Sequence, residues 1–179
     1  MVGHNYVQEA EAMIAALGHR AQWHMLGHLQ RNKAGAAVGL FDMIQSLDSL
    51  RLARALDRRS AEAGRVMPVL VEVNSGREEA KTGVLPQDID GFVEEASRLQ
   101  HLKIQGLMTM GPLLEDPEGL RPYFRLTREA FHRLARKAPP GVEMRYLSMG
   151  MSDSYLVAVQ EGANMVRLGT CIFGPRPAA

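Results

Sequence analysis

The sequence predicts an α/β protein whose parallel strands are joined by helices. Short apolar runs alternate along the chain with longer segments in which apolar residues recur at helical spacing. No linker, low-complexity segment or shift in composition interrupts this alternation, so we expect residues 1–179 to form a single domain. The pattern shows roughly six or seven strand–helix units, whereas a full (β/α)8 barrel takes about 250 residues. An incomplete barrel and an open doubly wound sheet therefore both remain open at this point.

The boundaries of several elements follow from turn and capping residues. Gly18 ends the first helix, Asp48 or Ser49 can cap the second, and Pro68 and Asn74 bound the most strongly β-branched strand. The predicted strands are residues 23–27, 43–47, 69–73, 104–110, 144–148 and 165–169, and the predicted helices are residues 7–17, 50–63, 89–99, 120–138 and 152–160.

Composition excludes several classes of protein. Apolar residues make up 46% of the chain, charged residues 23%, and the net charge is +1, which argues against a nucleic-acid backbone as partner. No apolar stretch approaches the roughly 20 residues of a membrane helix, and the N-terminus has no signal-peptide pattern. Cys171 is the single cysteine, which rules out an internal disulfide and a cysteine metal cluster. We expect a cytoplasmic protein.

Two segments near the C-terminus have the composition of an anion-binding site. Residues 148–153 leave a strand and open a helix, so backbone N–H groups, with Ser148 or Ser152, can face an anion while Gly150 lets it approach. Gly169 and Thr170 follow the next strand and can add an N–H group and a hydroxyl. In a barrel both segments lie at the carboxyl ends of the strands, where phosphate often binds. Read alone, residues 148–152 are equally well an ordinary strand-to-helix turn with an N-cap, and Arg167 is better read as a surface or ion-pair residue.

Other candidate sites are weaker. His24 and His28 have the i, i+4 spacing of some metal sites, but Gly27 interrupts the segment, so a packed or hydrogen-bonded histidine is the better reading of each. Ser152 and Asp153 have no histidine partner defined by the sequence, which argues against a hydrolase triad. We predict no metal site.

These motifs, taken together, resemble one family. In order along the chain, the matching segments are residues 3–9 (G-H-N-Y-V-Q-E), 23–33 (W-H-M-L-G-H-L-Q-R-N-K), 45–49, 73–83, 106–110, 147–153 (L-S-M-G-M-S-D) and 166–174 (V-R-L-G-T-C-I-F-G). The sequence is similar to the pyridoxal-phosphate homeostasis proteins, which are related to the N-terminal barrel of alanine racemases. That resemblance implies a TIM-type (β/α)8 barrel that lacks its first strand and the helix after it.

The resemblance also implies a ligand and its contacts. Pyridoxal 5′-phosphate would be held through its phosphate by the two turns, with Arg167 facing the pyridine nitrogen and keeping it unprotonated. The implied cofactor-binding residues are Asn5, His24, Ser148, Met149, Gly150, Ser152, Arg167, Gly169 and Thr170.

The departures from the family pattern concern the N-terminus. The lysine that carries the cofactor in the family ends the first strand, upstream of the segment that begins at Gly3, and His4 replaces the usual glutamate. A gene model that starts too late, a natural short form and a fragment that works with another chain are the three explanations, of which we favour the first. The resemblance implies a monomer, but open strand edges would here lower stability and promote association.

We therefore expect a non-catalytic protein of vitamin B6 and amino-acid homeostasis that binds the cofactor non-covalently. The alternatives are a racemase-like enzyme, for which Lys81 would have to replace the missing lysine, and a scaffold that binds no cofactor.

Overall fold

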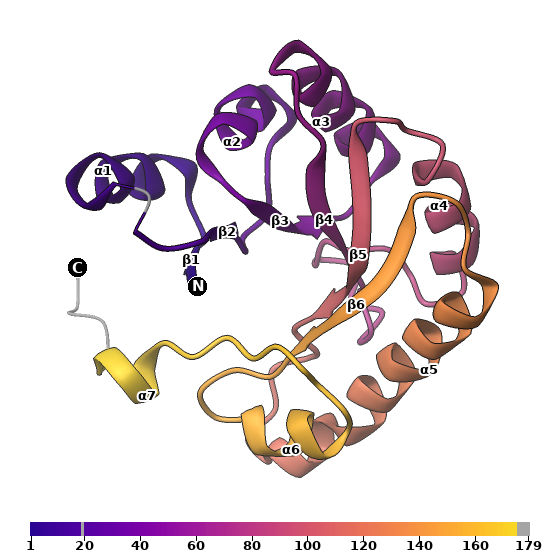
Figure 1. The fold of residues 1–179 in the computed structure, drawn as a ribbon. Helices are drawn as coiled ribbons and strands as arrows, with labels where there is room; N and C mark the ends of the chain where they lie inside the picture. The colour runs from indigo at the N-terminus through magenta and orange to yellow at the C-terminus, as the bar shows by residue number, and fades with distance from the viewer. Residues whose placement is uncertain (19, 175–179) are drawn as a thin grey trace.

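The computed structural model describes residues 1–18 and 20–174. Its core is a six-stranded, wholly parallel sheet in the order β1 to β6 (Figure 1). The strands are β1 Val2–His4, β2 Trp23–Met25, β3 Met43–Leu47, β4 Met67–Glu72, β5 Leu102–Thr109 and β6 Val142–Met149. The α-helices are α1 Val7–Leu17, α2 Ala34–Leu40, α3 Leu50–Glu62, α4 Ile89–Ala96, α5 Arg121–Lys137, α6 Tyr155–Gln160 and α7 Thr170–Phe173, with 3-10 turns at Arg31–Lys33 and Pro117–Leu120.

Alternating side chains divide the interior into two layers. Figure 1 shows the sheet curving, with α1 to α5 on its convex side. The large apolar cluster between sheet and helices contains Trp23, Ile44 and Val69. Met43, Leu70 and Met108 form a separate small cluster on the opposite, concave face of the sheet. Residues two positions further along each of these strands lie on the same concave face, near the carboxyl ends of the strands.

Most of the predicted elements are confirmed. Gly18 ends α1 with φ +67°, and Ser49 caps α3 by accepting a hydrogen bond from the Leu52 N–H group at 3.3 Å. The helix α2 escaped prediction because its Ala- and Gly-rich sequence lacks a clear apolar stripe. The predicted helix at residues 152–160 begins three residues later, at Tyr155, after a turn.

The strand predicted at residues 165–169 is wrong. Met165 makes one isolated parallel bridge with Ser148, and the chain then leaves β6. A strand needs a ladder of successive pairs, and in the described ranges 1–18 and 20–174 these residues make no bridge besides the one between Met165 and Ser148. Within the same ranges β1 does not pair with β6, so the sheet is an open, curved arc of barrel type.

A buried ion cluster ties α6 to α5. Glu161, 4% exposed, lies just after α6 and contacts three arginines of α5: Arg121 at 3.1 Å, Arg125 at 3.2 Å and Arg128 at 3.0 Å. A hydrogen bond from Arg125 is the main cause that holds the pKa of Glu161 below its usual value of 4.5. The cluster thereby positions the helix that follows the first predicted anion turn.

We expect Glu161→Gln to lower the free energy of unfolding by about 2 kcal/mol at pH 7, because it removes a buried charge that three cations share. A carboxyl whose folded pKa is depressed contributes stability above pH 4.5, and this contribution is lost as the pH falls through the folded pKa. The difference between variant and wild type in urea unfolding should therefore shrink below pH 4.5. Glu129→Gln, on the exposed side of α5, is the matched control; an equal loss there would contradict the assignment.

In the part of the chain that the structure describes, no helix has both the length and the apolar character needed to cross a membrane.

Candidate functional site

The two predicted anion-binding turns, residues 148–153 and 167–170, meet beyond the carboxyl end of β6. The backbone N–H group of Arg167 donates to the Gly150 carbonyl oxygen at 3.0 Å, which joins one turn to the other. The hydroxyl oxygen of Ser152 accepts hydrogen bonds from the N–H groups of Gly169 (3.1 Å) and Cys171 (3.3 Å). Two backbone donors thus converge on one oxygen atom, an arrangement typical of anion-binding turns.

Gly150 is required by both the conformation and the packing of its turn. Its φ is +87°, where side chains are disfavoured. A Cβ atom there would lie 2.6 Å from Cβ of Ala158 and 2.9 Å from Cα of Tyr155. The turn can therefore rest directly on α6, and Ser154 closes it by accepting a hydrogen bond from the Met151 N–H group at 3.1 Å.

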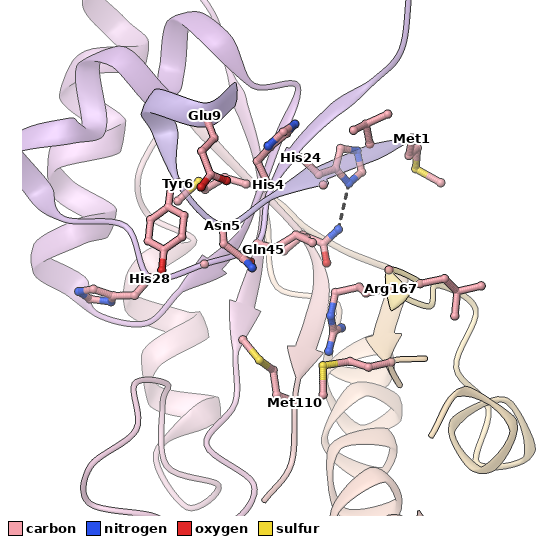
Figure 2. A pocket seen from close by; sticks show the side chains of 18 of the residues that line it. Met1, His4, Asn5, Tyr6, Glu9, His24, His28, Gln45, Met110 and Arg167 are labelled. Carbon is pink, nitrogen blue, oxygen red and sulfur yellow. Dashed lines mark hydrogen bonds between the residues drawn. The ribbon is translucent and has the colours of Figure 1, made fainter. Parts of the chain in front are cut away.

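Arg167 begins a chain of hydrogen bonds across the concave side of the sheet. Its guanidinium donates to the Ser148 hydroxyl at 2.8 Å and to the Thr109 carbonyl oxygen at 2.9 Å. The Ser148 hydroxyl donates to Oε1 of Gln45 at 2.7 Å. The Gln45 amide nitrogen then lies 2.9 Å from Nδ1 of His24, the bond drawn in Figure 2. This chain fixes the Arg167 and His24 side chains with respect to each other.

Burial sets the charges of these groups. Burial lowers the pKa of Arg167 to about 10, although the nearby Glu72 carboxylate acts to raise it. A pKa of about 10 still leaves the guanidinium charged at pH 7. Burial likewise lowers the pKa of His24, with Asp42 opposing the shift, so the imidazole is neutral at pH 7. Burial raises the pKa of Glu72 to about 6.

A cavity of about 1310 Å³ opens beside these groups (Figure 2). Six predicted site residues line it: Asn5, His24, Ser152, Arg167, Gly169 and Thr170. The other three, Ser148, Met149 and Gly150, are buried behind the lining, where they shape the turn and hold Arg167. Of the four lysines, Lys33 lines this cavity and Lys81 lines a smaller neighbouring one.

Sequence reasoning missed the residues that connect the site. Gln45, Glu72 and Thr109 stand in otherwise apolar strands, and a polar side chain within such a strand was the available signal. The two histidines lie as expected: His24 bonds Gln45, while His28 pairs with Asp48 at 2.8 Å. No group of potential ligands suited to a metal ion occurs in residues 1–18 and 20–174.

Comparison with known proteins defines the class of protein first. The family model described as the alanine racemase N-terminal domain matches residues 1–177. An alanine racemase of Clostridium difficile shares the fold, with a TM-score of 0.79 at 16% identity, over 98% of this chain and 45% of that one.

The particular family follows from closer relatives. The pyridoxal phosphate homeostasis protein of Aquifex aeolicus is 43% identical over 175 residues, 97% of this chain and 76% of that protein, and its Helicobacter pylori counterpart is 34% identical over 174 residues, 96% of this chain and 75% of that protein. The structure of PipY from Synechococcus elongatus without pyridoxal phosphate has a TM-score of 0.89 at 40% identity, and the form with the cofactor bound has 0.86 at 38%; each covers 96% of this chain and 80% of PipY. The chain belongs to the pyridoxal phosphate homeostasis protein family.

Proposed function

We propose that this chain binds pyridoxal 5′-phosphate non-covalently in the large cavity and acts, without catalysis, as a cytoplasmic protein of vitamin B6 and amino-acid homeostasis. The observation that carries the proposal is the meeting of the two anion turns with a charged arginine at one cavity. Two related proteins are named pyridoxal phosphate homeostasis proteins, and PipY has been solved with pyridoxal phosphate bound.

The residues present fit the cofactor. The N–H groups of Gly169 and Cys171 already converge on an oxygen atom, that of Ser152, and a phosphate oxygen can accept from the same donors. Ser152 and Thr170 add hydroxyl groups, while Ser148, Met149 and Gly150 support the turn. A volume of about 1310 Å³ exceeds what a molecule of this size needs.

Arg167 would determine the state of the cofactor ring. When bound, pyridoxal phosphate supplies an aldehyde conjugated to a pyridine ring that can withdraw electrons. Because the guanidinium keeps its proton, a pyridine nitrogen that faces it accepts a hydrogen bond and remains unprotonated, which weakens electron withdrawal. Asn5, which directly follows β1, and His24 in β2 would contact the ring. This arrangement favours binding of the cofactor over catalysis with it.

We expect titration of the purified chain with pyridoxal 5′-phosphate to give a saturable absorbance change. After borohydride reduction and removal of free cofactor, little absorbance should remain with the protein, because the binding is non-covalent. Pyridoxal without the phosphate is the control and should bind at least tenfold more weakly. An unsaturable response, or equal affinity for pyridoxal, would contradict the proposal.

A racemase-like enzyme is the second candidate, and it needs a lysine that reaches the aldehyde and a second base. Lys33 is a second candidate for this lysine, in addition to Lys81, because it lines the large cavity. Peptide mapping after borohydride distinguishes them: a label on either residue would support covalent chemistry, and the absence of label on both would exclude it for this chain.

A further inference from the structure

Gln45 lies where the two sides of the site meet. It stands in the middle of β3, is 2% exposed and is part of the wall of the large cavity. Figure 2 shows its amide between His24 and Arg167. Because a buried amide is costly unless its N–H groups and its oxygen are hydrogen-bonded, the partners of Gln45 indicate what the residue does in the site.

Both N–H groups of this amide are used within the protein. The amide nitrogen lies 2.9 Å from Nδ1 of His24 in β2, and it donates to the sulfur atom of Met165 at 3.2 Å. An amide nitrogen carries two hydrogens, and a thioether sulfur accepts hydrogen bonds but cannot donate them. The nitrogen therefore faces His24 and Met165, and neither N–H group of Gln45 is left to bind a ligand.

The amide oxygen points the other way, toward Arg167. Oε1 accepts a hydrogen bond from the Ser148 hydroxyl at 2.7 Å, and the same hydroxyl accepts one from the Arg167 guanidinium at 2.8 Å. Ser148 is fully buried, and its hydroxyl hydrogen can rotate to suit its partners. The acceptor on Gln45 fixes the direction of that hydrogen, which leaves the lone pairs of the Ser148 oxygen directed at Arg167.

We propose that Gln45 is a positioning residue of the cofactor site: through Ser148 it holds the Arg167 guanidinium in the orientation that binds pyridoxal 5′-phosphate. This inference rests on the function proposed above. A direct contact between Gln45 and the phosphate would need an N–H group, and both are already bound. Without Gln45 the Ser148 hydroxyl is free to turn, and Arg167 keeps one firmly placed partner, the Thr109 carbonyl oxygen at 2.9 Å.

The first test needs no cofactor. Nitrogen-15 NMR of the cofactor-free protein measures how fast the Arg167 guanidinium rotates about its Cζ–Nε bond, and Arg167→Met identifies its signals. Rotation should be at least about fivefold faster in Gln45→Met, which has a similar volume but no amide. Unchanged rotation would overturn the proposal. Gln105→Met is the matched control, because Gln105 is partly buried in β5 and lies outside the lining of the large cavity; rotation there should stay within about twofold of wild type.

The second test separates positioning from direct contact through a double-mutant cycle. Gln45→Met should weaken binding of pyridoxal 5′-phosphate by about tenfold in the wild-type background. In the Arg167→Met background the same substitution should weaken it by less than about threefold, because no guanidinium remains to be positioned. Equal losses in the two backgrounds would mean that Gln45 acts on the cofactor independently of Arg167, and would overturn the proposal.

A smaller change breaks the same link from its other end. Ser148→Ala removes the hydroxyl between Gln45 and Arg167, so it should also speed rotation of the guanidinium by at least about fivefold. It decides the question if melting temperatures show that Gln45→Met does not fold; a wild-type rotation rate in Ser148→Ala would overturn the proposal. Absence of saturable cofactor binding in wild type would instead refute the proposed function, and the rotation rates tell the two failures apart.

Discussion

Gly106→Ala is expected to lower the free energy of unfolding by about 3–5 kcal/mol, the largest effect on stability that we predict for a single methyl group. Gly106 lies in β5 opposite Tyr146 of β6, with φ +148°. An added Cβ would overlap the Tyr146 carbonyl oxygen and lie 2.7 Å from its carbonyl carbon and 3.0 Å from its nitrogen. Since these are backbone atoms of the neighbouring strand, they cannot move without separating β5 from β6.

Chemical denaturation followed by circular dichroism would measure this loss. Gly91→Ala is the matched control, because Gly91 is an exposed residue in α4 with open space where its Cβ would stand. Alanine there should stabilise the protein by up to about 1 kcal/mol, since it lowers the chain entropy of the unfolded state and favours the helix. If Gly106→Ala unfolded within about 1 kcal/mol of wild type, the close approach of the two strands would be refuted.

Arg167→Met is expected to weaken binding of pyridoxal 5′-phosphate by about 100-fold, on the basis of the function proposed above. The substitution retains much of the side-chain volume but removes a charged donor, and a hydrogen bond from a charged group contributes about 1.5–3 kcal/mol. It also leaves the Ser148 hydroxyl and the Thr109 carbonyl oxygen without the donor that holds them.

Titration of both proteins with the cofactor would measure the change. Arg145→Met provides the control, because Arg145 is exposed on β6, over the ring of Tyr146, and does not line the large cavity. Its affinity should equal that of wild type within about threefold. An Arg167→Met protein that melts like wild type and binds the cofactor equally well would remove Arg167 from the proposed site.

The fold was largely predictable because its signals are local. Helix spacing, Gly18 and the cap at Ser49 act within a few residues, and the structure confirms them. The strand predicted at residues 165–169 failed because a short apolar run describes only a local preference, while a strand depends on neighbours that are remote in sequence. The helix α2 is the opposite case, because it was not predicted but is present. Its small residues show little periodicity, yet they pack in the core.

The candidate site was predictable only where its residues form contiguous motifs. The turns at residues 148–153 and 167–170 could be read directly, and the structure brings them together through Ser152. Gln45 could not be placed in the site from the sequence, because its partner Ser148 lies 103 positions away. Glu72 escaped for the same reason: its burial and its missing donor are properties of the folded chain.

The hydrogen bonds that begin at Arg167 all run in one direction, toward His24. Arginine can only donate, so the Ser148 oxygen accepts from Arg167, and the Ser148 hydroxyl donates to Oε1 of Gln45. This orientation of the Gln45 amide presents its NH2 group to Nδ1 of His24, which then acts as acceptor. A neutral histidine whose Nδ1 accepts carries its proton on Nε2. A hydrogen-bond orientation that begins at one arginine thereby matches a single tautomer of an imidazole on the far side of the arc.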